Sequence, residues 1–300
     1  MEPWVLLSIS AAAFQTLRFM LQKRLSMGSL SAGGATLARF LFAAPVVALF
    51  ALAIILSGED AHLHLTLPFW VYAAIGGLTQ ILATWCVVLL FAERNFAVGI
   101  TFKKTEVVQT ALVGFLLLGD RVSMLGMAAI ILGLVGVLIL SETPGLSGRW
   151  WQRLASRATV LGVASGAFFA VSAVGYRAAT LEIASDDPFA RAVLTLCVVT
   201  AMQTLALSLW LRWREPGQVG RVVAAHRVGV WLGLLGMAGS LCWFTAFTLQ
   251  NAALVFAVGQ VEVIFSILAA TLFFGERITA REFAGITLIT VSVIGVVSFG

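Results

Sequence analysis

Two stretches of the chain, EVVQTALVGFLLLGDR at residues 106–121 and EVIFSILAATLFFGER at residues 262–277, share one pattern at a constant offset of 156 residues. Each places a glutamate within an apolar run and ends that run with glycine, an acidic residue and arginine. Apolar segments resemble one another by chance, but a mid-helix glutamate followed by this ending does not recur by chance. We infer that the chain contains an internal repeat, and this repeat decides the predicted fold.

A shorter match precedes each copy: FAVG occurs at 96–99 and again at 256–259, at an offset of 160 residues. The difference of four residues between the two offsets is about one turn of α-helix. The first copy is therefore predicted to contain an extra turn beside Lys103 and Lys104.

The amino-acid composition indicates that the chain lies in a lipid bilayer. Of 300 residues, 60% are hydrophobic and 11% are charged, and the mean hydropathy is +1.01. Soluble globular proteins are about 25% charged, so soluble, fibrous, disordered and disulfide-rich classes are excluded. The net charge of +5 does not indicate nucleic-acid binding, because the basic residues lie in short loops between apolar runs.

A helix that crosses a bilayer needs roughly 20 apolar residues. Helices are expected because lipid offers no hydrogen-bond partner to the backbone. Ten segments meet this requirement, and the predicted spans are 4–22, 34–56, 69–91, 96–118, 123–140, 160–180, 189–211, 229–249, 253–274 and 281–299.

The repeat divides these spans into two units of five. Because five is odd, the two units must run in opposite orientations through the membrane. The predicted fold is an all-α integral membrane protein with ten transmembrane helices in two inverted five-helix repeats, an architecture that secondary transporters use. The predicted division is residues 1–141, a connecting loop at 142–159, and residues 160–300.

Ten spans in two copies, each with GDR or GER after its fourth helix, resemble the EamA type of the drug/metabolite transporter superfamily. Arg39-Phe40 at the start of the second span fits the same resemblance. Members often carry Glu-Pro in the fourth and ninth helices, whereas this chain has Glu106-Val107 and Glu262-Val263 and so lacks the proline that would break those helices. The resemblance implies transport of amino acids, other metabolites or drugs.

Charged residues within the spans are candidates for the transport pathway, because charge in a bilayer is costly. Glu106 and Glu262 are the two acidic residues deep in a span. Lys103 lies one turn before Glu106, so these two are predicted to form an ion pair. Lys104 is rotated by about 100° from Lys103 and is predicted to be freer to meet an anion or another helix.

Glu262 shares its helical face with Gly259 and Ser266 and has no basic neighbour in its own helix. We expect it to alternate between substrate and a proton, which would make it the proton-handling residue. In the alternative, Lys104 or Arg18 reaches across from another helix and neutralises it.

A stripe of polar residues in the first span, Ser8, Gln15 and Gln22 with Arg18 close by, faces either a pathway or a neighbouring helix. Two tryptophans at mid-span, Trp85 and Trp243, line an apolar pocket in one interpretation and pack in the core in the other.

Arg39 and Arg191 lie a few residues into their spans, so their side chains are expected to extend to the membrane interface. Together with Arg18, Lys103 and Lys104 they place five basic residues within spans, against two acidic ones. This balance suits a substrate with a carboxylate or phosphate.

The predicted function is that of a secondary transporter, an exporter of a small metabolite such as an amino acid or organic anion, that uses a proton or counter-substrate. The alternatives are a multidrug or cation exporter and a non-transporting membrane scaffold. Enzyme motifs are absent, and the three histidines lie in loops, so no catalytic residue, metal or cofactor is predicted.

The loops after odd-numbered spans hold 12 Lys and Arg residues if Arg281, the first residue of the last span, is included. Those after even-numbered spans hold two if Arg177, near the end of the sixth span, is included. The positive-inside rule therefore places both termini outside the cytoplasm, whereas the family resemblance implies both inside. We expect a multi-pass protein of the bacterial cytoplasmic membrane.

Overall fold

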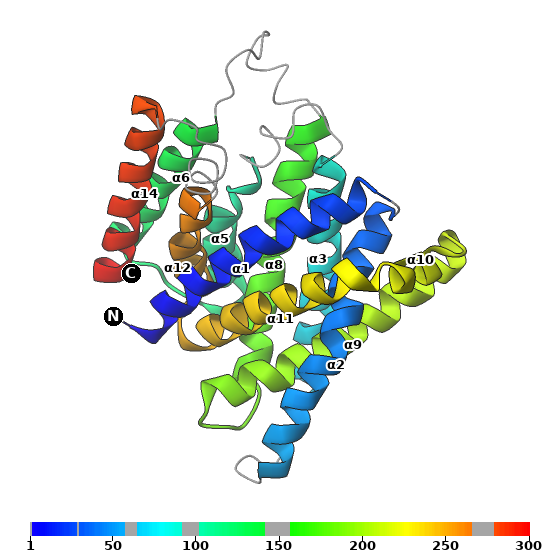
Figure 1. The fold of residues 1–300 in the computed structure, drawn as a ribbon. Coiled ribbons are helices and arrows are strands. Elements are labelled where there is room, and N and C mark those ends of the chain that lie inside the picture. The colour runs from blue at the N-terminus through cyan, green and yellow to red at the C-terminus, as the bar shows by residue number, and fades with distance from the viewer. Residues whose placement is uncertain (1, 29, 58–64, 92–101, 142–156, 266–278) are drawn as a thin grey trace.

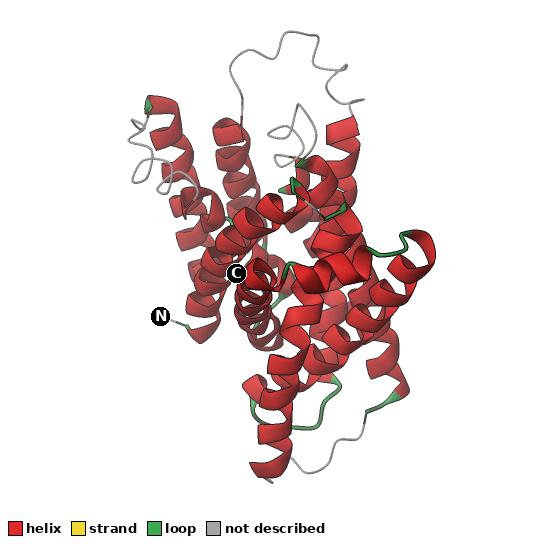
Figure 2. Ribbon diagram, turned by 45° about the vertical axis from the view of Figure 1, so that its right-hand side comes forward, coloured by secondary structure: helices red, strands yellow, loops and turns green. Residues whose placement is uncertain are grey.

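The structure is a computed structural model that describes residues 2–28, 30–57, 65–91, 102–141, 157–265 and 279–300. The described part of the chain is helical and contains no strand. Its eleven helices form one bundle, in which long helices cross one another obliquely (Figures 1 and 2). Several predicted features lie outside the described residues, among them the histidines His62 and His64, the second Gly-acid-Arg motif and the loop between the halves.

The first half of the chain contains five described helices. They are α1 (Pro3–Ser26), α2 (Ala32–Ser57), α3 (Leu67–Leu90), α5 (Glu106–Leu118) and α6 (Met124–Ser141). Four agree with the predicted spans within four residues at either end. The fourth span differs, because α5 begins only at Glu106. The extra turn was predicted beside Lys103 and Lys104; these two residues are described, whereas residues 92–101 before them lie outside the described residues.

The second half contains six described helices. They are α8 (Arg157–Leu181), α9 (Pro188–Arg214), α10 (Gln218–Ala224), α11 (His226–Leu249), α12 (Ala252–Gly259) and α14 (Ala280–Phe299). The short helix α10 corrects the prediction of a plain loop between the seventh and eighth spans. Gly217 permits the turn into α10 with a positive φ of 85°, and Val222 is fully buried there.

Local signals explain several helix ends. The Thr66 side chain accepts a hydrogen bond from the backbone N–H of Phe69 at the start of α3. Asp187 does the same for Phe189 and Ala190 at the start of α9. Gly119 ends α5 in the left-handed conformation with φ 68°, a backbone state that glycine adopts without strain.

Six helices are long and apolar enough to cross a membrane, namely α1, α2, α3, α8, α9 and α11. Four more of the described helices are apolar but shorter: α5, α6, α12 with its continuation to Phe265, and α14 from Phe283. Large hydrophobic side chains such as Leu116, Met124 and Trp213 are exposed on the outer surface, as expected of helices that face lipid.

Helices from the two halves pack against one another in pairs. The most extensive contacts join α3 with α8, α6 with α14, α1 with α11, and α2 with α9; α5 also contacts α12. Figure 1 shows α6 and α14 side by side. Glycines permit several close approaches: a Cβ at Gly175 would lie 3.2 Å from the Gly76 Cα, and Gly229 and Gly233 accommodate Phe42.

Candidate substrate-binding site

Both repeated helices are interrupted next to their glutamates. Lys104 and Thr105 form a turn immediately before Glu106, the first residue of α5. Likewise α12 ends at Gly259, Gln260 forms a turn, and the helix resumes at 261–265, which contains Glu262. Neither interruption contains proline. The two copies therefore share a break in the helix just before their glutamates, in addition to the shared sequence pattern.

Two glycines let neighbouring helices approach these interruptions. A Cβ at Gly166 of α8 would lie 2.9 Å from the Lys103 carbonyl oxygen. A Cβ at Gly259 would lie 2.4 Å from the Trp243 ring. The helix interruptions therefore coincide with close contacts between helices and not with a proline.

The first glutamate is paired within its own span. Lys103 Nζ donates to Glu106 Oε1 at 2.9 Å, and both side chains are buried. The ammonium also lies 4.9 Å from the centre of the Phe169 ring, a cation–π contact. The predicted Lys103–Glu106 pair is confirmed.

The second glutamate is paired across the two halves. Lys104 Nζ donates to Glu262 Oε2 at 2.7 Å, and Gln15 Nε2 donates to the same oxygen at 3.0 Å. Of the two possibilities left open by the sequence, neutralisation of Glu262 from another helix is the one observed. Lys104 was predicted to be freer than Lys103 to meet an anion or another helix, and in this conformation its ammonium meets a residue of another helix through this buried salt bridge.

Two buried arginines lie near these pairs without a carboxylate partner among the described residues. Arg18 donates to Gln22 Oε1 at 2.9 Å. Arg39 donates to Ser240 Oγ at 3.0 Å and to Thr84 Oγ1 at 3.3 Å. Arg39 is 5% exposed, so the expectation that it extends to the membrane interface is wrong. The glycine at 236 makes room for both arginines: a Cβ there would lie 3.1 Å from Arg39 Cγ and 3.5 Å from Arg18 Cδ.

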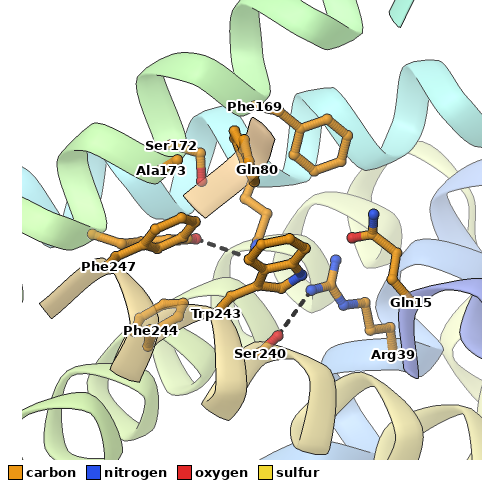
Figure 3. A pocket seen from close by; sticks show the side chains of 12 residues that line it. Gln15, Arg39, Gln80, Phe169, Ser172, Ala173, Ser240, Trp243, Phe244 and Phe247 are labelled. Atoms are coloured by element: carbon orange, nitrogen blue, oxygen red, sulfur yellow. Dashed lines mark hydrogen bonds between the residues drawn. The ribbon is translucent and has the colours of Figure 1, made fainter. Parts of the chain in front are cut away.

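A small cavity lies between helices of both halves. One part of its lining is aromatic and consists of Phe169, Tyr176, Trp243, Phe244, Phe247 and Phe256. The polar part consists of Gln15, Arg39, Gln80, Ser172 and Ser240. Figure 3 shows Arg39 and Gln15 on one side of the Trp243 indole and Phe244 and Phe247 on the other.

A second, smaller cavity shares Arg39, Gln80 and Ser240 with the first. A hydrogen-bonded group lies near both cavities: Tyr176 Oη donates to Gln80 Oε1 at 3.0 Å, and Gln203 Nε2 donates to the same oxygen at 2.9 Å. Arg39 thus lies where the two cavities meet, and an anion in either one could reach its guanidinium.

An ion pair lies near the ends of α5, α8 and α11, on the side of the bundle where the N- and C-termini of the chain lie. Arg177 Nε donates to Asp120 Oδ2 at 3.0 Å, and its Nη1 donates to the carbonyl oxygens of Phe247 and Gln250 at 2.6 and 2.8 Å. Asp120 belongs to the first Gly-acid-Arg motif. This one side chain therefore ties the ends of α5, α8 and α11 together, next to the aromatic end of the cavity.

The predicted pathway residues fall into three groups. Gln15 and Trp243 line the cavity, whereas Lys103, Lys104, Glu106, Glu262 and Arg18 form the buried charged cluster beside it. Trp85 belongs to neither group: it packs edge-on against Trp210 at 4.8 Å between ring centres. Its interpretation as ordinary packing is the one that the structure favours.

Comparisons with known proteins identify the class of this chain. The model of the EamA-like transporter family matches residues 156–298, which include the helices from α8 to α14. This part of the chain is therefore similar to a family of transporters, in agreement with the resemblance to the drug/metabolite transporter superfamily. The match and the apolar helices together support a multi-pass integral membrane protein.

The fold of the whole chain also has a counterpart among solved structures. A structure described only as a crystal structure of a protein matches with a TM-score of 0.68 and 18% sequence identity, covering 97% of this chain and 99% of its own. At that identity the likeness concerns the fold alone. No curated protein matches the chain in sequence.

Proposed function

We propose that the protein is a secondary transporter that carries a small organic anion across a membrane by alternating access. The observation that carries this proposal is the cavity between the two halves, whose described lining includes the buried guanidinium of Arg39 and no acidic residue. A concave, mostly apolar site with few polar groups is typical of small-molecule binding, and transporters place it where two repeats meet.

The charges around the cavity favour an anion over a cationic drug. Four basic side chains are buried there, Arg18, Arg39, Lys103 and Lys104. The lysines are paired with two glutamates, whereas among the described residues the arginines bind only uncharged acceptors. An uncompensated buried charge is unfavourable, so binding of an anionic substrate would relieve a cost that a cationic drug would increase.

The pairing of helices supports an inverted repeat of residues 1–141 and 160–300. Exchanging the halves converts the α1–α11 contact into the α8–α3 contact. The α2–α9, α5–α12 and α6–α14 contacts each convert into themselves. This is the pattern of a pseudo-two-fold axis, about which the halves can rock so that the cavity opens to one side of the membrane and then to the other.

The proposed cycle includes closure on the side of the termini by the Arg177–Asp120 ion pair. Release of Arg177 would free the ends of α8 and α11 and open the aromatic end of the cavity. The partner that drives the cycle is a proton or a counter-substrate, and Glu262 is the proposed proton carrier, provided that its salt bridge with Lys104 opens during the cycle.

We propose that the protein exports its substrate across the bacterial cytoplasmic membrane, with both termini outside the cytoplasm. The 12 basic residues in loops after odd-numbered spans, against two in the others, support this orientation. A C-terminal reporter that is active only in the cytoplasm should give no signal. A strong signal would instead support the orientation that the family resemblance implies.

Reconstitution in proteoliposomes tests the transport proposal. Uptake should be saturable for organic anions and absent for cationic dyes. Arg39→Gln should lower the initial rate at least tenfold, whereas Arg191→Gln serves as the matched control, because Arg191 follows alanine as Arg39 does but contacts a loop carbonyl, that of Ser185. Uptake of cationic dyes alone would support a drug exporter, and no uptake of any solute would support a scaffold.

A further inference from the structure

We propose that the cavity selects aromatic carboxylates that lack an amino group, such as aryl-acetic and aryl-2-oxo acids, with the carboxylate on Arg39 and the ring among the aromatic side chains around Trp243. This inference rests on the proposed transport function and specifies its substrate class. It follows from three features: a mutually packed aromatic cluster, an arginine with spare donors, and a lining in which none of the described residues is acidic.

The aromatic cluster has the geometry of a ring-binding site. Trp243 and Phe247 are nearly parallel, with 16° between their planes and 5.8 Å between centres. Phe256 meets both edge-on, at 5.3 Å from Trp243 and 5.4 Å from Phe247. All three rings line the cavity, and aromatic pairs prefer these offset and perpendicular arrangements. A substrate ring bound beside these side chains would extend an existing aromatic cluster.

Arg39 lies at the polar end of the same cavity (Figure 3). Of the five N–H groups of a guanidinium, Arg39 uses two for Ser240 and Thr84. Both acceptors are uncharged hydroxyls, so the positive charge has no counter-ion among the described residues. A planar carboxylate is the group that a guanidinium binds best, through two parallel hydrogen bonds, and the Ser240 hydroxyl can donate a further one.

An ammonium group would have no carboxylate partner among the described residues that line this site. The nearby acids, Glu106 and Glu262, are engaged by Lys103 and Lys104. An α-ammonium group would thus be desolvated close to a guanidinium, which is unfavourable. An aromatic amino acid and its 2-oxo analogue have the same ring and carboxylate, so the difference between them isolates this effect.

A panel of ligands that differ in ring, carboxylate and amino group tests the proposed ligand class on the unmodified protein. Purified protein in detergent is titrated with phenylpyruvate, phenylacetate, phenylalanine, phenethylamine and 4-methyl-2-oxopentanoate, with the shift in thermal unfolding as the measurement. Phenylpyruvate and phenylacetate should bind at least tenfold more tightly than phenylalanine and than the aliphatic oxo acid, and phenethylamine should not bind. Equal affinity for phenylalanine, or for the aliphatic acid, would overturn the assignment.

Variants then locate the two contacts. Arg39→Gln should remove most of the affinity for phenylpyruvate, and Trp243→Leu should reduce its affinity about tenfold while leaving that for the aliphatic acid unchanged. Trp85→Leu is the matched control, because Trp85 is also at mid-span but packs outside the cavity. Unchanged phenylpyruvate affinity in a folded Arg39→Gln variant would overturn the proposed orientation.

Transport of the same panel in proteoliposomes separates the two proposals. Binding of aryl acids without transport would contradict the transport function and leave the ligand class intact. Transport of organic anions with no preference for an aromatic ring would overturn the ligand class and leave the transport function intact.

Discussion

The two repeated glutamates occupy equivalent positions in sequence and have different partners in space. Glu106 is bound by Lys103, three residues earlier in the same span, whereas Glu262 is bound by Lys104 and Gln15 from the other half of the chain. The first pair can persist however the halves move. The Lys104–Glu262 pair must break if the halves separate. Of the two pairs, it is therefore the one whose formation depends on the conformation of the transporter.

The lysines can be compared directly, because they are adjacent in the chain and serve different glutamates. Lys103→Met should leave the buried Glu106 carboxylate without its only described side-chain donor. Removing one partner of a buried pair costs about 3–5 kcal/mol, so a large fall in thermal stability is expected. Thermal unfolding in detergent, monitored by loss of the monomer peak in size exclusion, measures it.

The double variant Lys103→Met, Glu106→Gln removes both charges and should recover most of that stability. A single variant as stable as the parent protein would show that Glu106 is not held by Lys103, and the contrast between a local and a remote pair would disappear.

Lys104→Gln should affect transport more than folding. The introduced amide can still donate to Glu262, and Gln15 continues to do so. The loss in stability should therefore be smaller, about 1–3 kcal/mol. The anion flux should fall severalfold, because the closed arrangement of the halves loses the salt bridge that joins them. Initial rates in proteoliposomes decide this, and equal rates for every anion carried would contradict it.

Glu262→Gln tests proton handling. This variant should keep substrate binding and lose the pH dependence of transport, because only a carboxylate that leaves its lysine can take up a proton during the cycle. Glu106→Gln is the matched control and should keep the pH profile. The reverse outcome would assign the proton to the local pair.

Hydropathy and the repeat were sufficient to predict the helical spans and the Lys103–Glu106 pair. Residues three apart remain close across a single turn of the chain, so the spacing predicted this contact although the helix is interrupted at Lys104 and Thr105. The interruptions before Glu106 and after Gly259 were not predictable in the same way, because proline, the local signal for a break, is absent. Contacts with Gly166 and Trp243 come from other helices, and local sequence does not encode their approach.

The binding site was only partly predictable for the same reason. Gln15 and Trp243 stood out as polar and aromatic side chains within apolar spans, and both line the cavity. Arg39 was assigned to the interface from its distance to the end of the span. Its burial depends instead on Ser240, which is 201 residues away, and on the room left by Gly236. The recurrence of Ala-Arg at 38–39 and 190–191 was the one sequence feature that singled out Arg39. It did not predict burial, because Arg39 and Arg191 occupy different environments in the structure.

Gly259→Ala should have the smallest effect of these changes, and it tests whether the second interruption shapes the cavity. The added methyl would lie 2.4 Å from the Trp243 ring, and the indole can relieve this contact by moving toward the cavity that it lines. We expect a loss of about 1 kcal/mol in stability and a reduced affinity for aromatic ligands.

Gly166→Ala is the matched change at the first interruption. Its methyl group would lie against the Lys103 backbone carbonyl, and a backbone group cannot rotate away as a side chain can. It should lower stability and leave ligand selectivity unchanged. If Gly166→Ala altered aromatic selectivity and Gly259→Ala did not, the local pair rather than the remote one would be coupled to the binding site.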